Sequence, residues 1–145
     1  MRKLKDLAPP LELCRKIPVG KFEDSALVFI FWHKSPNTPV EIRTRCELEN
    51  DPEFDDLVEE QRIIIYPAPT LEEIMAALPT IVQERGLQYY LLMTDARNYA
   101  GCFSVGYGRL EGKFLIPSKF ISKSSNLTIA AMELWFKVED QSCRE

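Results

Sequence analysis

Histidine is the first residue to consider, because imidazole is the usual general base near neutral pH and a common metal ligand. The chain has one histidine, His33, at the end of an apolar segment. No HExxH motif, no CxxC motif and no second histidine accompanies it, so the sequence lacks a recognisable zinc ligand set. We therefore predict no metal and no other cofactor.

Nucleophilic side chains do not form a recognisable catalytic pattern either. Ser25 and Ser104 lie in no G-x-S-x-G elbow. A cysteine–histidine pair needs proximity in space, which the sequence does not reveal. We interpret the cysteines as structural and predict no catalytic residue. The cysteines that could meet His33 in the fold are Cys14, Cys46 and Cys102.

Two segments look like ligand sites but lack what such sites need. Residues 106–112 are glycine-rich, yet they have no Lys-Ser/Thr pair and their third glycine falls one residue late for G-x-G-x-x-G. We interpret them as a tight turn. Residues 47–60 carry eight acids and no base. We interpret this acidic segment as a solvated loop with one helical turn around Phe54. Alternatively, it is a site for a cation or a basic partner.

Basic residues gather in two clusters. Residues 1–21 carry a net charge of +4, and residues 109–123 carry +3 interleaved with Phe114 and Phe120. Basic residues between aromatic ones can bind single-stranded nucleic acid by charge and stacking. The alternative is a pair of solvated faces. The candidate nucleic-acid-binding residues are Lys3, Lys5, Lys113 and Lys119.

The whole chain is slightly acidic, with a net charge of −4 and a pI near 5.2. This balance argues against broad, non-specific binding to nucleic acid or to an anionic membrane. The first residues do not resemble a signal peptide, and no apolar run approaches the 20 or so residues that span a bilayer. We therefore expect a cytoplasmic protein without a membrane partner, and all four cysteines reduced.

Most of the segments that would position the candidate residues have the sequence pattern of β-strands. Residues 25–34 are apolar on both alternate faces, which is typical of a strand covered on both sides. Residues 40–47 alternate strictly, which indicates a strand with one wet face, paired with the first as a hairpin. Gly101 and Gly106 suggest a bulge or a close backbone approach. Further strands are predicted at residues 62–66, 88–94 and 99–107, with a turn at 95–98 and an additional strand candidate at 113–116.

Helix signals occur in three places. A short helix is predicted at residues 10–16, after a proline pair. Thr70 and Glu73 form a capping box, in which each side chain bonds the other residue's backbone N–H. An apolar stripe follows it, formed by Leu71, Ile74, Met75 and Leu78. Ser124, Ser125 and Asn126 offer N-caps for the last helix. One face of this helix carries Leu127, Ala130, Ala131, Leu134, Trp135 and Val138.

These elements predict the α+β class. We expect one globular domain over residues 1–145, with residues 1–6 and 140–145 frayed. Its largely antiparallel sheet of about five strands would pack against two main helices and the short N-terminal helix.

Four stretches of the chain resemble small open reading frames of prophages and mobile elements in gut bacteria. They are residues 7–14 (LAPPLELC), 22–28 (FEDSALV), 66–71 (YPAPTL) and 131–135 (AMELW). The similarity spans most of the chain. It implies a bacterial or phage cytoplasmic context, and it brings no activity, cofactor or site residue with it.

Three functional hypotheses follow. The first is a non-enzymatic binding or adaptor module that engages a protein partner or associates with itself. The second is a nucleic-acid-associated accessory protein, motivated by the two basic clusters. The third is a small enzyme that uses carboxylates or a free cysteine.

Overall fold

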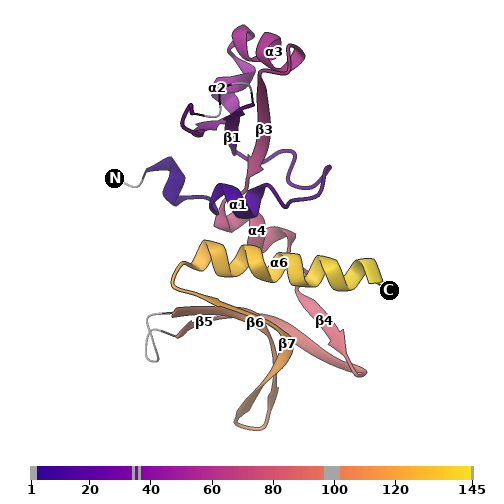
Figure 1. The fold of residues 1–145 in the computed structure, drawn as a ribbon. Coiled ribbons are helices and arrows are strands. Elements are labelled where there is room, and N and C mark those ends of the chain that lie inside the picture. The colour runs from indigo at the N-terminus through magenta and orange to yellow at the C-terminus, as the bar shows by residue number, and fades with distance from the viewer. Residues whose placement is uncertain (1–2, 34, 36, 97–101, 145) are drawn as a thin grey trace. The chain divides into compact units, whose positions relative to one another are not determined.

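The fold of this chain consists of two compact units, Met1–Glu73 and Ile74–Glu145 (Figure 1). The computed structural model describes residues 3–33, 35, 37–96 and 102–144. Each unit combines helices with its own antiparallel sheet, which confirms the α+β class. The strands form a three-stranded and a four-stranded sheet, where the sequence pattern suggested one sheet of about five strands.

The sheet of the first unit is built around β1 (Leu27–Trp32), which pairs antiparallel with β2 (Glu41–Thr44) on one side and β3 (Ile63–Ala68) on the other. Val28 and Ile30 are fully buried and share a core cluster with Leu48 and Phe54. The neighbouring residues Leu27 and Phe29 point to the opposite face and are buried as well. The prediction of a strand covered on both sides is therefore confirmed.

The acidic segment is helical, so its interpretation as a mostly irregular loop was wrong. It forms α2 (Arg45–Glu49) and α3 (Pro52–Glu59), and β2 ends at Thr44 instead of Glu47. Thr44 Oγ1 accepts a hydrogen bond from the N–H of Glu47 at 3.2 Å, and Asp51 Oδ1 accepts one from Glu53 at 3.0 Å. The acids in the first turns also favour the positive end of each helix dipole. The buried ring of Phe54 anchors α3 to the sheet.

The capping box forms as predicted. The N–H of Thr70 donates to Glu73 Oε1 at 2.9 Å, and the N–H of Glu73 donates to Thr70 Oγ1 at 3.3 Å. They begin α4 (Leu71–Ala77), which is followed by Leu78 and Pro79. The short N-terminal helix is also confirmed as α1 (Leu11–Cys14), preceded by the 3₁₀ turn η1 (Leu4–Asp6).

The sheet of the second unit is an antiparallel meander in the order β4-β5-β6-β7. Its strands are β4 (Ile81–Glu84), β5 (Leu87–Ala96), β6 (Cys102–Glu111) and β7 (Phe114–Ser124). The sequence pattern did not predict β4, which is joined to β5 by a two-residue turn with positive φ at Arg85 and Gly86. In the predicted turn at 95–98, Asp95 and Ala96 belong to β5. The rest of that turn and Gly101 lie outside the described residues.

One long helix, α6 (Leu127–Arg144), lies across this sheet (Figure 1). It is capped by Asn126, whose Oδ1 accepts a hydrogen bond from the N–H of Ile129 at 3.1 Å. The predicted apolar face of α6 packs inward, with Ala131 and Leu134 fully buried. The segments 1–6 and 140–145 were expected to fray, yet most of their residues have regular secondary structure. The 3₁₀ turn η1 covers Leu4–Asp6, and α6 continues to Arg144.

Candidate functional site

The two faces of the β4–β7 sheet differ in how much apolar surface they expose. Val105, Tyr107 and Phe120 lie on the face toward α6 and are buried. On the other face Tyr90 remains 51% exposed and Leu115 47% exposed. We call this second surface the open face. Its residues are Tyr90, Leu92, Leu110, Leu115, Pro117 and Ile121.

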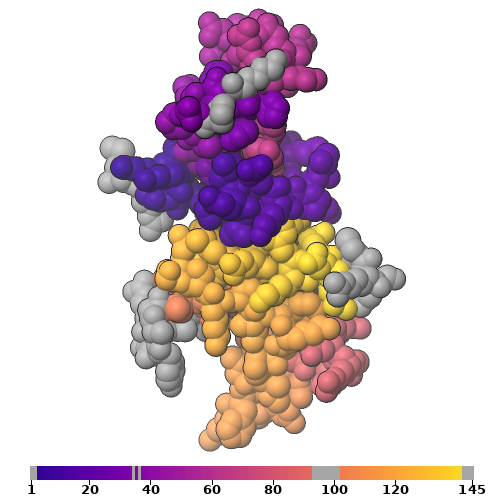
Figure 2. Space-filling model, viewed as in Figure 1, coloured from indigo at the N-terminus to yellow at the C-terminus, as the bar shows by residue number. Residues whose placement is uncertain are grey.

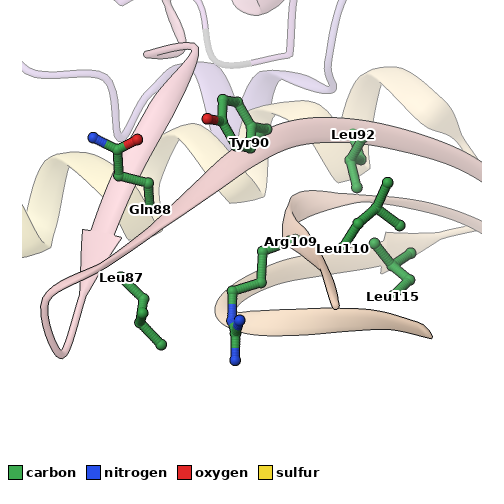
Figure 3. A pocket seen from close by; sticks show the side chains of 8 residues that line it. Leu87, Gln88, Tyr90, Leu92, Arg109, Leu110 and Leu115 are labelled. Atoms are coloured by element: carbon green, nitrogen blue, oxygen red, sulfur yellow. The ribbon is translucent and has the colours of Figure 1, made fainter. Parts of the chain in front are cut away.

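A cleft forms on the open face because two hairpins of the sheet diverge. The pairing of β5 with β6 stops at Tyr90 and Gly108, whereas the pairing of β6 with β7 continues to Glu111 and Phe114. The β6–β7 hairpin therefore projects from the rest of its unit (Figures 1 and 2). The cleft measures about 450 Å³. Its lining residues are Leu87, Gln88, Tyr90, Leu92, Gly108, Arg109, Leu110 and Leu115 (Figure 3).

Glycines in β6 explain why the open face is hollow at its centre. A Cβ atom at Gly106 would lie 2.7 Å from the carbonyl oxygen of Phe120, and one at Gly108 would lie 3.1 Å from the methyl tips of Leu92 and Leu115. The register between β6 and β7 also shifts between these two glycines. The predicted close approach at Gly106 is thus confirmed. A smaller hollow of about 100 Å³ adjoins the cleft and shares Leu92, Gly108 and Leu115 with it.

Charged groups at the cleft are largely paired within the chain. Arg109 Nη2 lies 3.0 Å from Glu111 Oε2, and the guanidinium sits 5.9 Å from the centre of the Tyr89 ring. Figure 3 shows Arg109 between Leu87 on one side and Leu110 on the other. The cleft is therefore apolar on its walls, with one compensated cation at its mouth.

The four lysines proposed for nucleic-acid binding are divided between the two units. Lys3 and Lys5 are exposed in the first unit, Lys3 at the N-cap of η1 and Lys5 within η1. Lys113 and Lys119 are exposed in the second unit, at the β6–β7 turn and on β7. The N–H of Lys119 donates to the Glu84 carboxylate at 3.1 Å, so a negative charge lies next to this lysine.

His33 and the cysteines occupy unrelated environments. His33 is exposed, and its backbone N–H donates to the carbonyl of Arg62 at 3.0 Å. Cys14 is buried, and this burial, with a smaller contribution from Glu12, raises its pKa to about 12. Such a thiol stays neutral at pH 7 and is a poor nucleophile. Cys46 is exposed and Cys102 is half-buried, and the Cys143 side chain lies outside the described part of the chain.

In the part of the chain that the structure describes, no group of three or more histidine, cysteine, aspartate or glutamate side chains is arranged to hold a metal ion. Among the same residues, no helix combines the length and the apolar character needed to span a membrane.

The open face was not predicted from the sequence. The pattern indicated a turn at Leu110 and made Phe114 an aromatic residue of a basic cluster. The available signal was the composition around Gly112, where Leu110, Phe114 and Leu115 flank a turn that favours polar residues. Leu110 and Phe114 are each 76% exposed, so these side chains do not enter the core.

No protein-family model, curated protein or solved structure matches this chain.

Proposed function

We propose that this chain is a non-enzymatic binding module whose working surface is the open face, and that a second copy of the chain occupies it. The observation that carries the proposal is the exposure of apolar side chains on both walls of the cleft. Leu110 and Leu115 form one wall, and Leu87 and Tyr90 form the other. When another apolar surface covers these exposed leucines, their side chains leave water, and this burial stabilises the contact.

The size of this surface supports a second copy as the occupant. The cleft walls expose four large apolar side chains, Leu110, Tyr90, Leu115 and Leu87, and a contiguous apolar patch of this kind marks an interaction surface. Two copies packed face to face would cover these side chains in both chains, and a specific interface needs about 1,000 Å² of buried surface in total. Because an interface of this size binds weakly, we expect a dissociation constant in the micromolar range.

The open face also suits a two-fold interface. In such a dimer the same patch meets itself, so a self-complementary arrangement is needed. The strand residues of the open face are uncharged, so two open faces can meet without opposing like charges. The ion pair of Arg109 with Glu111 does not enter this contact, because both residues alternate with Leu110 along β6 and their side chains lie on the opposite face.

Sedimentation equilibrium of the wild type and two variants tests this proposal. Leu110→Glu introduces a charge on the open face and should shift the dimer equilibrium at least tenfold toward the monomer. Phe114→Glu is the matched control: Phe114 is equally exposed and lies on the same hairpin, but the neighbouring position places its side chain on the opposite face. Equal effects of the two variants, or a wild type that is monomeric at 1 mM concentration, would overturn the proposal.

A nucleic-acid-associated role is the second candidate function, and the exposure of Lys3, Lys5, Lys113 and Lys119 favours it. If it is correct, wild-type protein binds single-stranded DNA with micromolar affinity that falls steeply with salt. Neutralising the four lysines should then abolish binding. Because the whole chain is acidic, we expect no binding at moderate salt.

The proposal also covers the cellular location of this module. The resemblance to prophage and mobile-element reading frames supports a bacterial or phage cytoplasm as the place where this module works.

A further inference from the structure

We infer that the first unit carries a second, separate binding site, which takes a doubly charged phosphate group of a small molecule. This inference is independent of the function proposed for the open face. The site is a cavity of about 490 Å³, within the range of small-molecule sites. It lies along β3, and its other walls come from residues 15–23 and from Arg45 at the start of α2.

Charge is the first argument for an anion. Three cations, Arg15, Lys21 and Arg45, line the cavity with one acid, Glu23, so the lining carries a formal charge of +2. Among the described residues, no carboxylate forms an ion pair with Arg15 or Arg45. A phosphate monoester carries about −1.5 to −2 charges at pH 7, which matches this lining.

Orientation is the second argument. The Arg15 guanidinium carbon lies 5.6 Å from the centre of the Phe31 ring and 5.8 Å from that of Tyr66, so two aromatic rings hold it in place. Arg45 is held from the other side, because its Nε donates to the Ser25 carbonyl at 2.8 Å. Guanidinium groups fixed in this way bind oxyanions without losing further side-chain freedom.

Apolar residues complete the lining and favour a ligand with an organic body over a bare ion. Ile17, Ile65 and Tyr66 contribute apolar surface beside the cations. A small organic phosphate therefore fits the cavity better than an extended polymer, whose phosphodiesters carry one charge each.

Titration calorimetry with pyrophosphate and with a 5′-mononucleotide, at ionic strength balanced with sodium chloride, tests this inference. We expect saturable binding of one anion per chain. Arg15→Gln and Lys21→Gln should each weaken it about tenfold, the usual size of one charge-assisted contact. Lys16→Gln removes the same charge from an exposed neighbour outside the cavity lining and should leave affinity unchanged.

Three results would overturn the inference. The first is no saturable binding of either anion by a folded wild type. The second is an equal loss of affinity in Lys16→Gln and Arg15→Gln. The third is binding of a single-stranded oligonucleotide without binding of pyrophosphate or the mononucleotide, which would assign these cations to a phosphodiester backbone. Lys21 is exposed, so Lys21→Gln remains a valid test if Arg15→Gln fails to fold.

Discussion

The carboxylate of Glu84 accepts a hydrogen bond from the backbone N–H of Lys119 at 3.1 Å, although these residues belong to β4 and β7, the two outer strands of the second sheet. The contact occupies a backbone donor of an edge strand at the position of the register shift. Edge strands with free donors invite pairing with other chains, so this carboxylate restricts where another chain can add.

Removing the Glu84 carboxylate should therefore expose the edge of β7. We expect Glu84→Ala to cost about 1 kcal/mol of stability and to accelerate hydrogen exchange at the Lys119 amide. Glu84→Gln keeps an accepting oxygen and should preserve most of the protection. If both variants leave the exchange rate of Lys119 unchanged, the hydrogen bond is not maintained in solution.

The glycines of β6 should differ in their tolerance of a methyl group. A Cβ at Gly106 meets a backbone oxygen at 2.7 Å, whereas one at Gly108 meets flexible leucine tips at 3.1 Å. We expect Gly106→Ala to lower the melting temperature by several degrees more than Gly108→Ala, because backbone yields less readily than a side chain. Equal melting temperatures would contradict the close packing of β6 against β7.

Glu73 should matter more to stability than Thr70, its partner in the capping box. Its carboxylate accepts from the N–H of Thr70 at 2.9 Å and also from the N–H of Ala26 at 3.2 Å. Thr70→Ala should cost about 1 kcal/mol, and Glu73→Ala more, because it removes two hydrogen bonds. Leu78→Asp, which places a charge at a buried position, should cost several-fold more than Thr70→Ala. Chemical denaturation of the three variants checks this order.

Stability should fall as the pH rises above about 9. Burial raises the pKa of Tyr107 to about 12, and burial with Glu12 raises that of Cys14 to about 12, above the ordinary values of 10.0 and 9.0. Both groups stay protonated in the folded chain while the unfolded chain releases their protons. Stability is therefore complete below pH 9 and declines toward pH 12, by up to about 1.4 kcal/mol per pH unit and group.

Denaturation midpoints between pH 7 and 11 measure this decline. Cys14→Ala should remove the part that begins near pH 9, and Tyr107→Phe the part that begins near pH 10. An alkaline decline of the same slope in the double variant would show that other groups cause it.

The parts of the fold that local chemistry determines could be predicted from the sequence. The Thr70–Glu73 box lies within one turn, and the two-faced apolar pattern of β1 needs no distant partner for its recognition. The helices of the acidic segment were missed because α3 is anchored by Phe54, whose burial depends on Val28 and Ile30 in another element. The strand β4 was missed because it is only four residues long and partly exposed.

The open face could not be predicted for the same reason. Its hollow depends on Gly106 meeting the backbone of Phe120, and its cleft depends on where the pairing of β5 with β6 ends. Both are properties of pairing between strands, which residue spacing along one strand does not specify. The cavity beside Arg15 likewise needs Arg45, which lies 30 residues further along the chain.

Isotope-filtered nuclear Overhauser measurements on a mixture of ¹³C-labelled and unlabelled protein test the central claim most directly. They detect only contacts between two copies of the chain. At a concentration where the dimer is populated, we predict contacts from the methyl groups of Leu110 and Leu115 to the other copy, and none from Val19, which is fully exposed in the first unit. Intermolecular contacts that avoid Leu110 and Leu115, or none at a concentration where the mass is that of a dimer, would contradict the claim that a second copy occupies the open face.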